Sequence, residues 1–295
     1  MTYDYKITVF TPTYNRAYII ENLYRSLCRQ TYRDFEWLVV DDGSTDSTEL
    51  LFQRLMGEAD FPIQYYKKEN GGKHTAINTG LSLAKGELFF TVDSDDWLTD
   101  DALHKILQWE QELPKNKKYC GFAGRLMDTK GNISGAKSEI RYLDGTTMDR
   151  YSIADGERAM IFYTSIHREY TYPVYPGESF MTEAIAWNRM AKDGYMFRFY
   201  NDVIWIYEYQ PDGLTKAGNS LFVKNPMGYG LFIREKADIL KLRGKSRFML
   251  YYSFCCEMSN FYSCKQLSAF LDIPLYYVKS ILWLHKLVGI GKKRK

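Results

Sequence analysis

Short β-prone runs alternate with segments of helical spacing in roughly the first 100 residues, and this order restricts the chain to few folds. The β-prone runs are residues 6–11, 35–40, 62–67 and 87–92. Between these runs lie three segments with apolar residues at helical spacing. They are residues 17–30, a segment that begins after Ser44 or Thr45 and runs through Leu55, and residues 75–84. Strands joined through helices form right-handed βαβ units and a mostly parallel sheet. We therefore expect an α/β fold in which helices flank one sheet.

Polar side chains follow three of the predicted strands. Thr13 comes after the first, Asp41 and Asp42 after the second, and Asp93 and Asp95 after the fourth. The carboxyl ends of parallel strands meet at one edge of a sheet, and α/β proteins bind their ligands outside that edge. The sequence therefore predicts a ligand crevice lined by these side chains.

The acidic cluster after the fourth strand stands out because Asp93, Asp95 and Asp96 directly follow an apolar run. Carboxylates at alternating positions can converge on one hard cation, which in turn can hold a diphosphate. Two aspartates at this spacing also occur by chance, so only the surroundings make a site of them. The alternative is an acidic loop that caps a helix starting near Thr99.

Charge and cysteine content narrow the class of protein. The net charge is only +3, but residues 241–295 hold 11 Lys or Arg against Glu257 and Asp272, a net of +9. Such an uneven distribution indicates two regions with different partners. The five cysteines lack zinc spacing, and residues 1–6 lack the pattern of a signal peptide. We therefore expect reduced thiols in a cytoplasmic protein.

Taken in order, the motifs at the strand ends resemble those of the family-two glycosyltransferases, which have the GT-A fold. The matching runs are Thr11-Pro12-Thr13-Tyr14-Asn15-Arg16, Val40-Asp41-Asp42-Gly43-Ser44-Thr45-Asp46, Asn70-Gly71-Gly72-Lys73-His74-Thr75-Ala76-Ile77-Asn78-Thr79-Gly80 and Asp93-Ser94-Asp95-Asp96. The resemblance implies an inverting transfer of a sugar from a nucleoside diphosphate donor, with UDP favoured, and with Mn²⁺ or Mg²⁺. It also implies a glycan or lipid-linked glycan acceptor in bacterial surface polysaccharide assembly.

The first two motifs are expected to hold the nucleoside. Pro12, Thr13 and Tyr14 turn the chain off the first strand, which brings backbone and ring toward the donor. The resemblance assigns the imide N–H of uracil to Asp42. The alternative for the second motif is a turn in which Ser44 or Thr45 caps the following helix.

The remaining motifs are expected to hold the phosphates and the metal. Gly71 and Gly72 let the backbone approach a ligand closely, and Lys73 is either a diphosphate contact or a surface lysine. His74 is either a ligand contact or a packed residue at a helix start. The resemblance assigns Asp95 to the metal and Asp93 to the ribose or the metal. Ser94, in the same loop, is expected to contact the donor. Asp96 orients its neighbours or contacts the donor sugar.

The acceptor half departs from the family pattern. An inverting transfer needs a general base, and the aspartate that usually supplies it is replaced by Ala184. We expect Glu183 to be the base, with Glu178 as the rival and a purely helix-favouring Glu183 as the alternative. Gln210 stands where the family has a histidine. We name Asp212, Thr215 or Lys216 as substitutes for that contact.

Residues 274–290 have helical spacing of apolar groups and are followed by the basic run 292–295. The stretch is too short and interrupted for a membrane span. Two interpretations remain, namely a packed or homodimer-forming helix and an interfacial helix that binds anionic lipid at the inner face of the membrane. Nucleic acid is not expected, since no recognition motif accompanies the charge.

The expected domains are a GT-A domain over 1–217, with a nucleotide-sugar half 1–112 and an acceptor half 113–217, and a basic helical extension over 218–295. Two other functions compete with transfer. A sugar nucleotidyltransferase would carry a glycine-rich loop after the first strand, and none is present there. A catalytically inactive nucleotide-sugar-binding module is motivated by Ala184 and Gln210.

Overall fold

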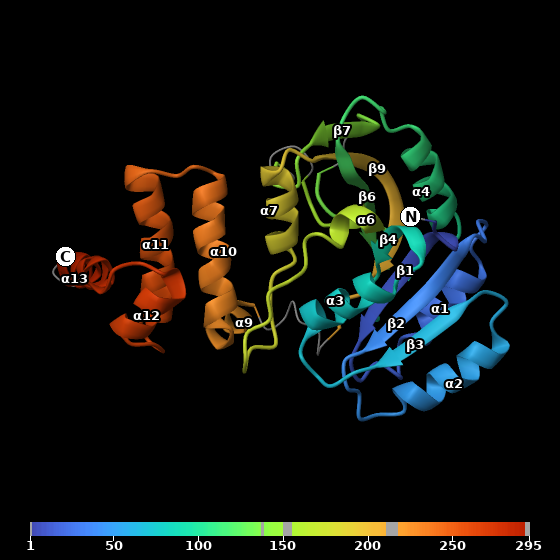
Figure 1. Cartoon of the computed structure of the whole chain (residues 1–295), viewed down its shortest axis with the longest axis horizontal. Coiled ribbons are helices and arrows are strands. Elements are labelled where there is room, and N and C mark those ends of the chain that lie inside the picture. The colour runs from blue at the N-terminus through green and yellow to red at the C-terminus, as the bar shows by residue number, and fades with distance from the viewer. Residues whose placement is uncertain (1, 137–138, 150–154, 211–217, 293–295) are drawn as a thin grey trace. The chain divides into compact units, whose positions relative to one another are not determined.

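The computed structural model describes residues 2–136, 139–149, 155–210 and 218–292, with side chains to residue 287. The chain divides into two compact units (Figure 1). Unit 1 is Met1–Tyr172 with Ala186–Gly213, and unit 2 is Pro173–Ile185 with Leu214–Lys295. The predicted boundary at 217/218 adjoins the undescribed residues 211–217, and it stays a prediction.

The elements of unit 1 alternate as expected. In chain order they are β1 (Tyr5–Thr13), α1 (Glu21–Cys28), β2 (Phe35–Asp41), α2 (Thr48–Glu58), β3 (Ile63–Lys67), α3 (Lys73–Leu83), β4 (Gly86–Thr91), β5 (Trp97–Leu98), α4 (Ala102–Gln111), β6 (Tyr119–Asp128), β7 (Tyr142–Gly145), β8 (Arg158–Tyr163), α6 (Thr164–His167) and β9 (Met196–Tyr207). Helix α7 (Ala184–Lys192) begins with the last two residues of the Pro173–Ile185 segment, which is assigned to unit 2, and its other residues belong to unit 1.

The strands form one mixed nine-stranded sheet in the order β3-β2-β1-β4-β8-β6-β9-β5, with β7 also paired to β9. The pairs β1–β2, β1–β4, β2–β3 and β6–β9 are parallel, whereas β8 runs antiparallel to both its neighbours. The prediction of an α/β fold with a mostly parallel sheet in the first hundred residues is confirmed. The chain leaves β1 toward β2 and returns from β3 to β4 on the other side, so the order reverses beside β1.

The first strand is longer than predicted, because pairing with β2 continues through Pro12 to Thr13. Phe10 O accepts a hydrogen bond from Val92 N (2.8 Å), while Thr13 O accepts one from Asp42 N (2.8 Å). Alternate residues of a strand face alternate neighbours, so Pro12 faces β4. Proline has no N–H to donate. It therefore ends the β1–β4 ladder while leaving the β1–β2 ladder intact.

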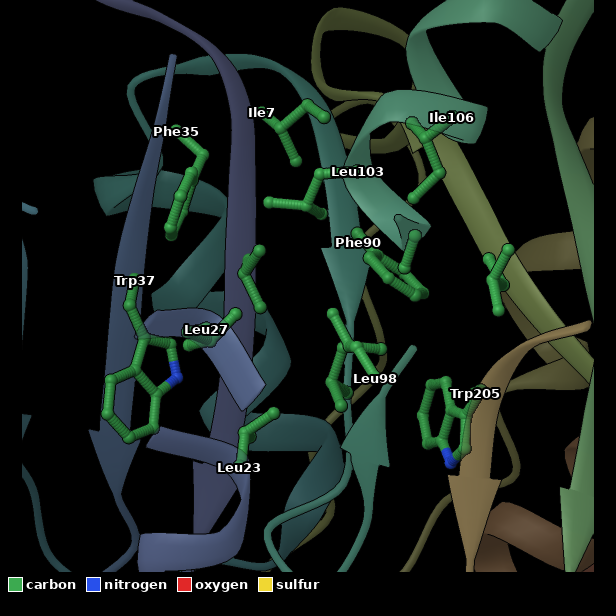
Figure 2. Close-up of a cluster of buried hydrophobic side chains, with 14 of the residues drawn as sticks. Ile7, Leu23, Leu27, Phe35, Trp37, Phe90, Leu98, Leu103, Ile106 and Trp205 are labelled. Atoms are coloured by element: carbon green, nitrogen blue, oxygen red, sulfur yellow. The ribbon is translucent and has the colours of Figure 1, made fainter. Parts of the chain in front are cut away.

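The sheet separates two apolar layers. On one face Leu23 and Leu27 of α1 pack with Ile7, Trp37 and other fully buried side chains, as Figure 2 shows. On the other face α3 approaches β1 so closely that Gly80 lies against the ring of Phe10. The two crossover helices thus cover opposite faces, which follows from right-handed connections that run in opposite directions.

Unit 2 is a bundle of helices. After α9 (Asn219–Lys224) come α10 (Pro226–Ile239), α11 (Gly244–Met258), α12 (Cys264–Leu271) and α13 (Leu275–Lys292). Its core includes Phe254, Met258, Leu267, Val278 and Ile281, so one face of α13 is packed within the unit. All five cysteines of the chain are free thiols.

Among the residues searched, which are those that the structure describes, no single helix has both the length and the apolar content to cross a membrane. Helices Cys264–Leu271 and Leu275–Leu287 meet those criteria only as a pair, and the pair is bent by 119°.

Candidate active site

Three polar strand ends meet at the carboxyl edge of the sheet, where the strand order reverses. Thr13 is in register with Asp41, and Asp42 N donates to Thr13 O at 2.8 Å. On the other side of β1, pairing with β4 reaches Thr91, two residues before Asp93. The registers therefore bring the ends of β1, β2 and β4 together as the sequence predicts.

Asp42 is buried and organises the glycine turn in front of α3. Its carboxylate accepts hydrogen bonds from Gly71 N (3.0 Å) and Gly72 N (2.6 Å) and pairs with Lys68 Nζ (2.6 Å). Gly72 has φ +90°, which side-chain-bearing residues rarely adopt. A carboxylate offers about four acceptor positions, so one remains for a ligand N–H. Sequence reasoning missed Lys68, which no motif marks.

The neighbouring carboxylate, Asp41, is fully buried and structural. It accepts from Ser44 N (2.7 Å) and from the hydroxyl of Tyr65. The expectation that Ser44 or Thr45 caps α2 is wrong. The N-cap residue is Ser47, whose side chain makes no capping hydrogen bond. Asp46 Oδ1, one residue earlier, accepts from Thr48 N at 3.0 Å, and Ser44 Oγ accepts from the backbone of the first loop.

Asn15 fastens the loop after β1 to the loop after β2, a role that the sequence analysis did not assign. Its Oδ1 accepts from Thr45 N (2.8 Å) and Asp46 N (3.3 Å), and its own N–H donates to Ser44 Oγ (2.8 Å). Its φ of +53° is one that asparagine tolerates better than most residues. An asparagine just past a predicted strand was the available signal.

The acidic cluster after β4 faces two basic side chains. Lys73 Nζ contacts Asp93 Oδ1 at 2.7 Å, so Lys73 belongs to the edge rather than to a distant surface. Burial, and then the charge of Asp93, raise the pKa of Asp95. The charges of Arg16 and Lys73 act against that rise. Arg16 thus contributes a positively charged side chain to this edge. The first motif contains Arg16, but the sequence analysis gave it no role.

Asp96 is turned toward the sheet. Its Oδ2 accepts from Trp205 Nε1 on β9 at 2.8 Å, a contact more than a hundred positions apart in the chain. Burial, followed by the charges of Asp93 and Asp95, raises the pKa of Asp96 to about 8. Trp205 packs edge-on against Phe90, so the loop is fixed to the core that Figure 2 shows.

The chemistry of this cluster fits a divalent cation that shares its ligands with a bound donor. Asp93 and Asp95 supply hard oxygen ligands, the type that Mn²⁺ and Mg²⁺ take, and their mutual repulsion is what a cation relieves. No group of three His, Cys, Asp or Glu side chains arranged for a metal occurs in the part of the chain that is described. Further ligands would therefore come from water or donor phosphates.

The remaining predicted donor contacts differ in accessibility. Tyr14 is 47% exposed at the mouth of the edge, whereas Pro12 and Ser94 are buried. Thr13 is 3% exposed, and its Oγ1 has no hydrogen-bond partner among the described residues. His74, on the first turn of α3, is 2% exposed with an unpartnered Nδ1.

The two candidate bases lie in unit 2 and have different surroundings. Both oxygens of Glu178 accept from the first turn of α10, from Met227 N (2.6 Å) and Gly228 N (2.9 Å). Burial raises the pKa of Glu178, and these two hydrogen bonds oppose the rise. Glu183 immediately precedes α7, where Thr182 Oγ1 accepts from Ala184 N at 3.4 Å. Glu178 is thus an anchor for a helix.

The structure describes only the first part of the segment that replaces the family histidine, through Gln210. Gln210 Nε2 donates to the backbone oxygen of Glu208 at 3.2 Å. The proposed substitutes Asp212, Thr215 and Lys216 lie outside the described residues.

Comparison with known proteins decides the family. The model of the glycosyl transferase family 2 matches residues 8–169, which is more than half of the chain and includes every strand-end motif. The chain belongs to glycosyl transferase family 2. The predicted resemblance is therefore confirmed.

Curated relatives match the same part of this family 2 chain. Glycosyltransferase GlyA of Streptococcus pneumoniae is 36% identical over 123 residues, 40% of this chain and 18% of the relative. A GalNAc(5)-diNAcBac-PP-undecaprenol beta-1,3-glucosyltransferase of Campylobacter jejuni is 33% identical over 132 residues, 44% of this chain and 41% of the relative. The matches span less than half of the length of these relatives.

Solved structures are similar over nearly the whole chain. The structure of TarS residues 1–349 from S. aureus with UDP-GlcNAc has a TM-score of 0.60 at 16% identity, covering 94% of this chain and 88% of that one. A mannosyltransferase from Pyrobaculum calidifontis, in complex with GDP-Man and Mn²⁺, has a TM-score of 0.56 at 19% identity, covering 98% and 81%. These likenesses bear on the fold, which is the GT-A fold.

Proposed function

We propose that this family 2 chain is an inverting glycosyltransferase that moves a sugar from a UDP-sugar to a glycan or lipid-linked glycan acceptor. The observation that carries the proposal is the meeting of Thr13, Asp42 and the Asp93–Asp95 loop at the switch-point edge of the sheet. An α/β sheet binds nucleotides at that place. The UDP-GlcNAc complex of TarS supports a uridine nucleotide.

The donor would lie across the three strand ends. Asp42 is held in place by Gly71, Gly72 and Lys68, so its remaining acceptor position is directed by the protein and not by a flexible side chain. We assign it to the imide N–H of uracil. Lys73 Nζ lies 2.7 Å from Asp93 Oδ1, so a cation bound at Asp93 would allow Lys73 to pair with the diphosphate.

Asp93 and Asp95 would hold the divalent cation. Mn²⁺ or Mg²⁺, when bound, offsets the negative charge that develops on the departing diphosphate. The chain supplies its own positive charge there as well, from Arg16 and Lys73, both of which act on Asp95. Asp96, which is held by Trp205, fixes the loop that carries the ligands.

We assign the general base to Glu183. In the transfer the acceptor oxygen bonds to the anomeric carbon as the bond from that carbon to the diphosphate oxygen breaks, and the acceptor proton passes to the base. The contacts of Glu178 with Met227 N and Gly228 N support this choice. A carboxylate that anchors α10 would lose those contacts if it moved to accept a proton.

Features of unit 2 support a proposal for the acceptor and the location. The exposed face of α13 carries Tyr276 (72% exposed), Trp283 (64%) and Leu287 (46%), with Lys279 and Lys286 beside them. Aromatic side chains with flanking lysines suit the boundary between lipid headgroups and acyl chains. We propose that this face binds an anionic membrane surface, which would bring the enzyme to a lipid-linked acceptor. The name of the Campylobacter relative, an undecaprenol-linked glucosyltransferase, supports that acceptor class.

The donor proposal is tested by calorimetric titration of UDP, GDP and dTDP with and without Mn²⁺. We expect UDP to bind in an Mn²⁺-dependent manner and Asp95→Asn to abolish that dependence. The control is Asp60→Asn, because Asp60 is 73% exposed just before the amino end of β3, away from the carboxyl edge. If Asp95→Asn binds Mn²⁺–UDP as tightly as the wild type, the metal assignment is wrong.

A further inference from the structure

A short segment carries the chain back along α3 before it leaves unit 1. Strand β8 is antiparallel to β4 and ends at Tyr163, which is in register with Leu88 near the amino end of β4. The return segment, residues 164–172, follows directly. Its first residue, Thr164, donates from Oγ1 to Gly86 O at 2.6 Å. The return segment therefore starts at the amino edge of the sheet, opposite to the donor edge.

Two polar side chains bind the return segment to α3. Arg168 Nε donates to Leu81 O at 2.6 Å, and the same guanidinium donates to Ala84 O, so it satisfies carbonyls at the end of the helix. Asn78 Nδ2 donates to Tyr172 O, and Asn78 Oδ1 accepts from Tyr172 N, both at 2.8 Å. Because Asn78 precedes Leu81 in α3, the return segment runs toward the first turn of that helix, which lies at the donor edge.

The pair of hydrogen bonds to Tyr172 depends on what a carboxamide offers. Tyr172 precedes Pro173, and a residue before proline is biased toward an extended backbone. The N–H and C=O of an extended residue point to the same side, as they do in an antiparallel sheet. A carboxamide presents a donor and an acceptor together, whereas a carboxylate meets only the N–H. Asn78 thus holds Tyr172 as a neighbouring strand would.

The inner side of the return segment is packed as well. His167 is 2% exposed and Tyr172 is 3% exposed, and the Tyr172 hydroxyl lies 3.3 Å from His167 Nε2. The ring of His167 contacts Phe89 of β4 and Phe162 of β8. Burial lowers the pKa of His167 to about 3, so the ring is uncharged near pH 7. The end of the return segment is therefore fixed both by α3 and by the sheet.

We propose that Asn78 is a positioning residue for the transfer reaction, because it fixes the point from which the chain enters the segment that carries the base. Tyr172 ends the first part of unit 1, and Pro173–Ile185, which contains Glu183, follows directly. Helix α3 begins with Lys73 at the donor edge, so one helix holds both a donor contact and this exit point. The inference rests on the proposed base and adds a residue that acts on Glu183 through the backbone.

The test begins with Asn78→Ala, which removes both hydrogen bonds to Tyr172. Hydrogen–deuterium exchange of the Tyr172 amide should become about tenfold faster. The kcat for release of UDP from UDP-GlcNAc, with Mn²⁺ and with water as the acceptor, should fall about 10–100-fold, because a small misplacement of a reacting group is costly. Its KM and the calorimetric affinity for Mn²⁺–UDP should stay unchanged. Asn78→Asp, which still accepts from Tyr172 N, should recover part of the protection from exchange.

The matched control is Ser82→Ala. Ser82 is exposed on the same helix, and its hydroxyl donates to Thr79 O within that helix, so exchange and kcat should both match the wild type. Unchanged exchange and kcat in Asn78→Ala would overturn this inference. Faster exchange with unchanged kcat would overturn it too, since Asn78 would then only stabilise unit 1. If Glu183→Gln releases UDP as fast as the wild type, the base assignment itself is wrong, and this inference falls with it.

Discussion

The close contact of α3 with β1 gives the sharpest test of how packing supports the site. A Cβ built on Gly80 would lie 2.2 Å from Cε2, 2.5 Å from Cδ2 and 2.8 Å from Cζ of Phe10. Phe10 is fully buried and stacked on Phe89 with ring centroids 4.9 Å apart. The ring therefore has little room to turn away. In Gly80→Ala, α3 itself has to move outward by about 1 Å to reach ordinary contact.

The magnitude follows from two opposing effects. Overpacking of a filled core costs about 1–3 kcal/mol, while alanine gains up to about 1 kcal/mol over glycine in a helix interior. The overpacking dominates, so we expect a net loss of about 1–2 kcal/mol. Gly57, in α2, is the matched control, because a Cβ there meets nothing within 4 Å. Gly57→Ala should stabilise the protein by about 0.5–1 kcal/mol.

The same displacement should reach the donor edge, because α3 begins with Lys73, whose Nζ lies 2.7 Å from Asp93. A misplacement of about 1 Å can cost about 100-fold in rate. Gly80→Ala should therefore lose donor binding and transfer, whereas Gly57→Ala should retain both.

Urea unfolding followed by tryptophan fluorescence measures the stability change. Trp37, Trp97, Trp109, Trp187 and Trp205 all lie in unit 1, so the signal reports mainly on the sheet. A Gly80→Ala protein that is as stable as Gly57→Ala, and equally able to bind UDP, would refute the packing argument.

Three further predictions concern other parts of the chain. Glu183→Gln should keep UDP binding and slow transfer by about 10²–10⁴-fold, whereas Glu178→Gln should mainly lower the melting temperature; the opposite pattern of rates would make Glu178 the base. The Arg198 guanidinium lowers the pKa of Asp144 to about 2 against the effect of burial, so its stabilisation is present above about pH 4 and is lost as the pH falls toward 2. Asp144→Asn should therefore be less stable than the wild type at pH 7 in thermal unfolding, and a gap that does not narrow on acidification would contradict this. Trp283→Ser should weaken binding to anionic vesicles, and added salt should weaken wild-type binding without abolishing it; flotation that is identical for both proteins would favour a packing or dimer helix.

Short-range pattern in the sequence was sufficient for the elements of the donor half. Residues 35–40 and 87–92 read as buried strands because their apolar runs end in polar turns, and the structure has strands at Phe35–Asp41 and Gly86–Thr91. The order of strands and helices also predicted that their polar ends share one edge, since right-handed crossovers allow little else.

Tertiary contacts decided what individual side chains do at that edge. Nothing local distinguishes Glu178 from Glu183, yet α10 supplies two amides to one of them from about 50 positions away. Trp205 reaches Asp96 from 109 positions away in the chain.

The sequence by itself thus determined the family, the α/β order and the residue types at the strand ends, because these depend on near neighbours and on periodicity. Only the tertiary structure decided that Pro12 lies within β1 and ends one ladder, that Asp42 is bound by Gly71 and Gly72, and that His74 is enclosed with an unpaired nitrogen. Burial and hydrogen-bond partners are properties of distant segments brought together, and no local pattern encodes them.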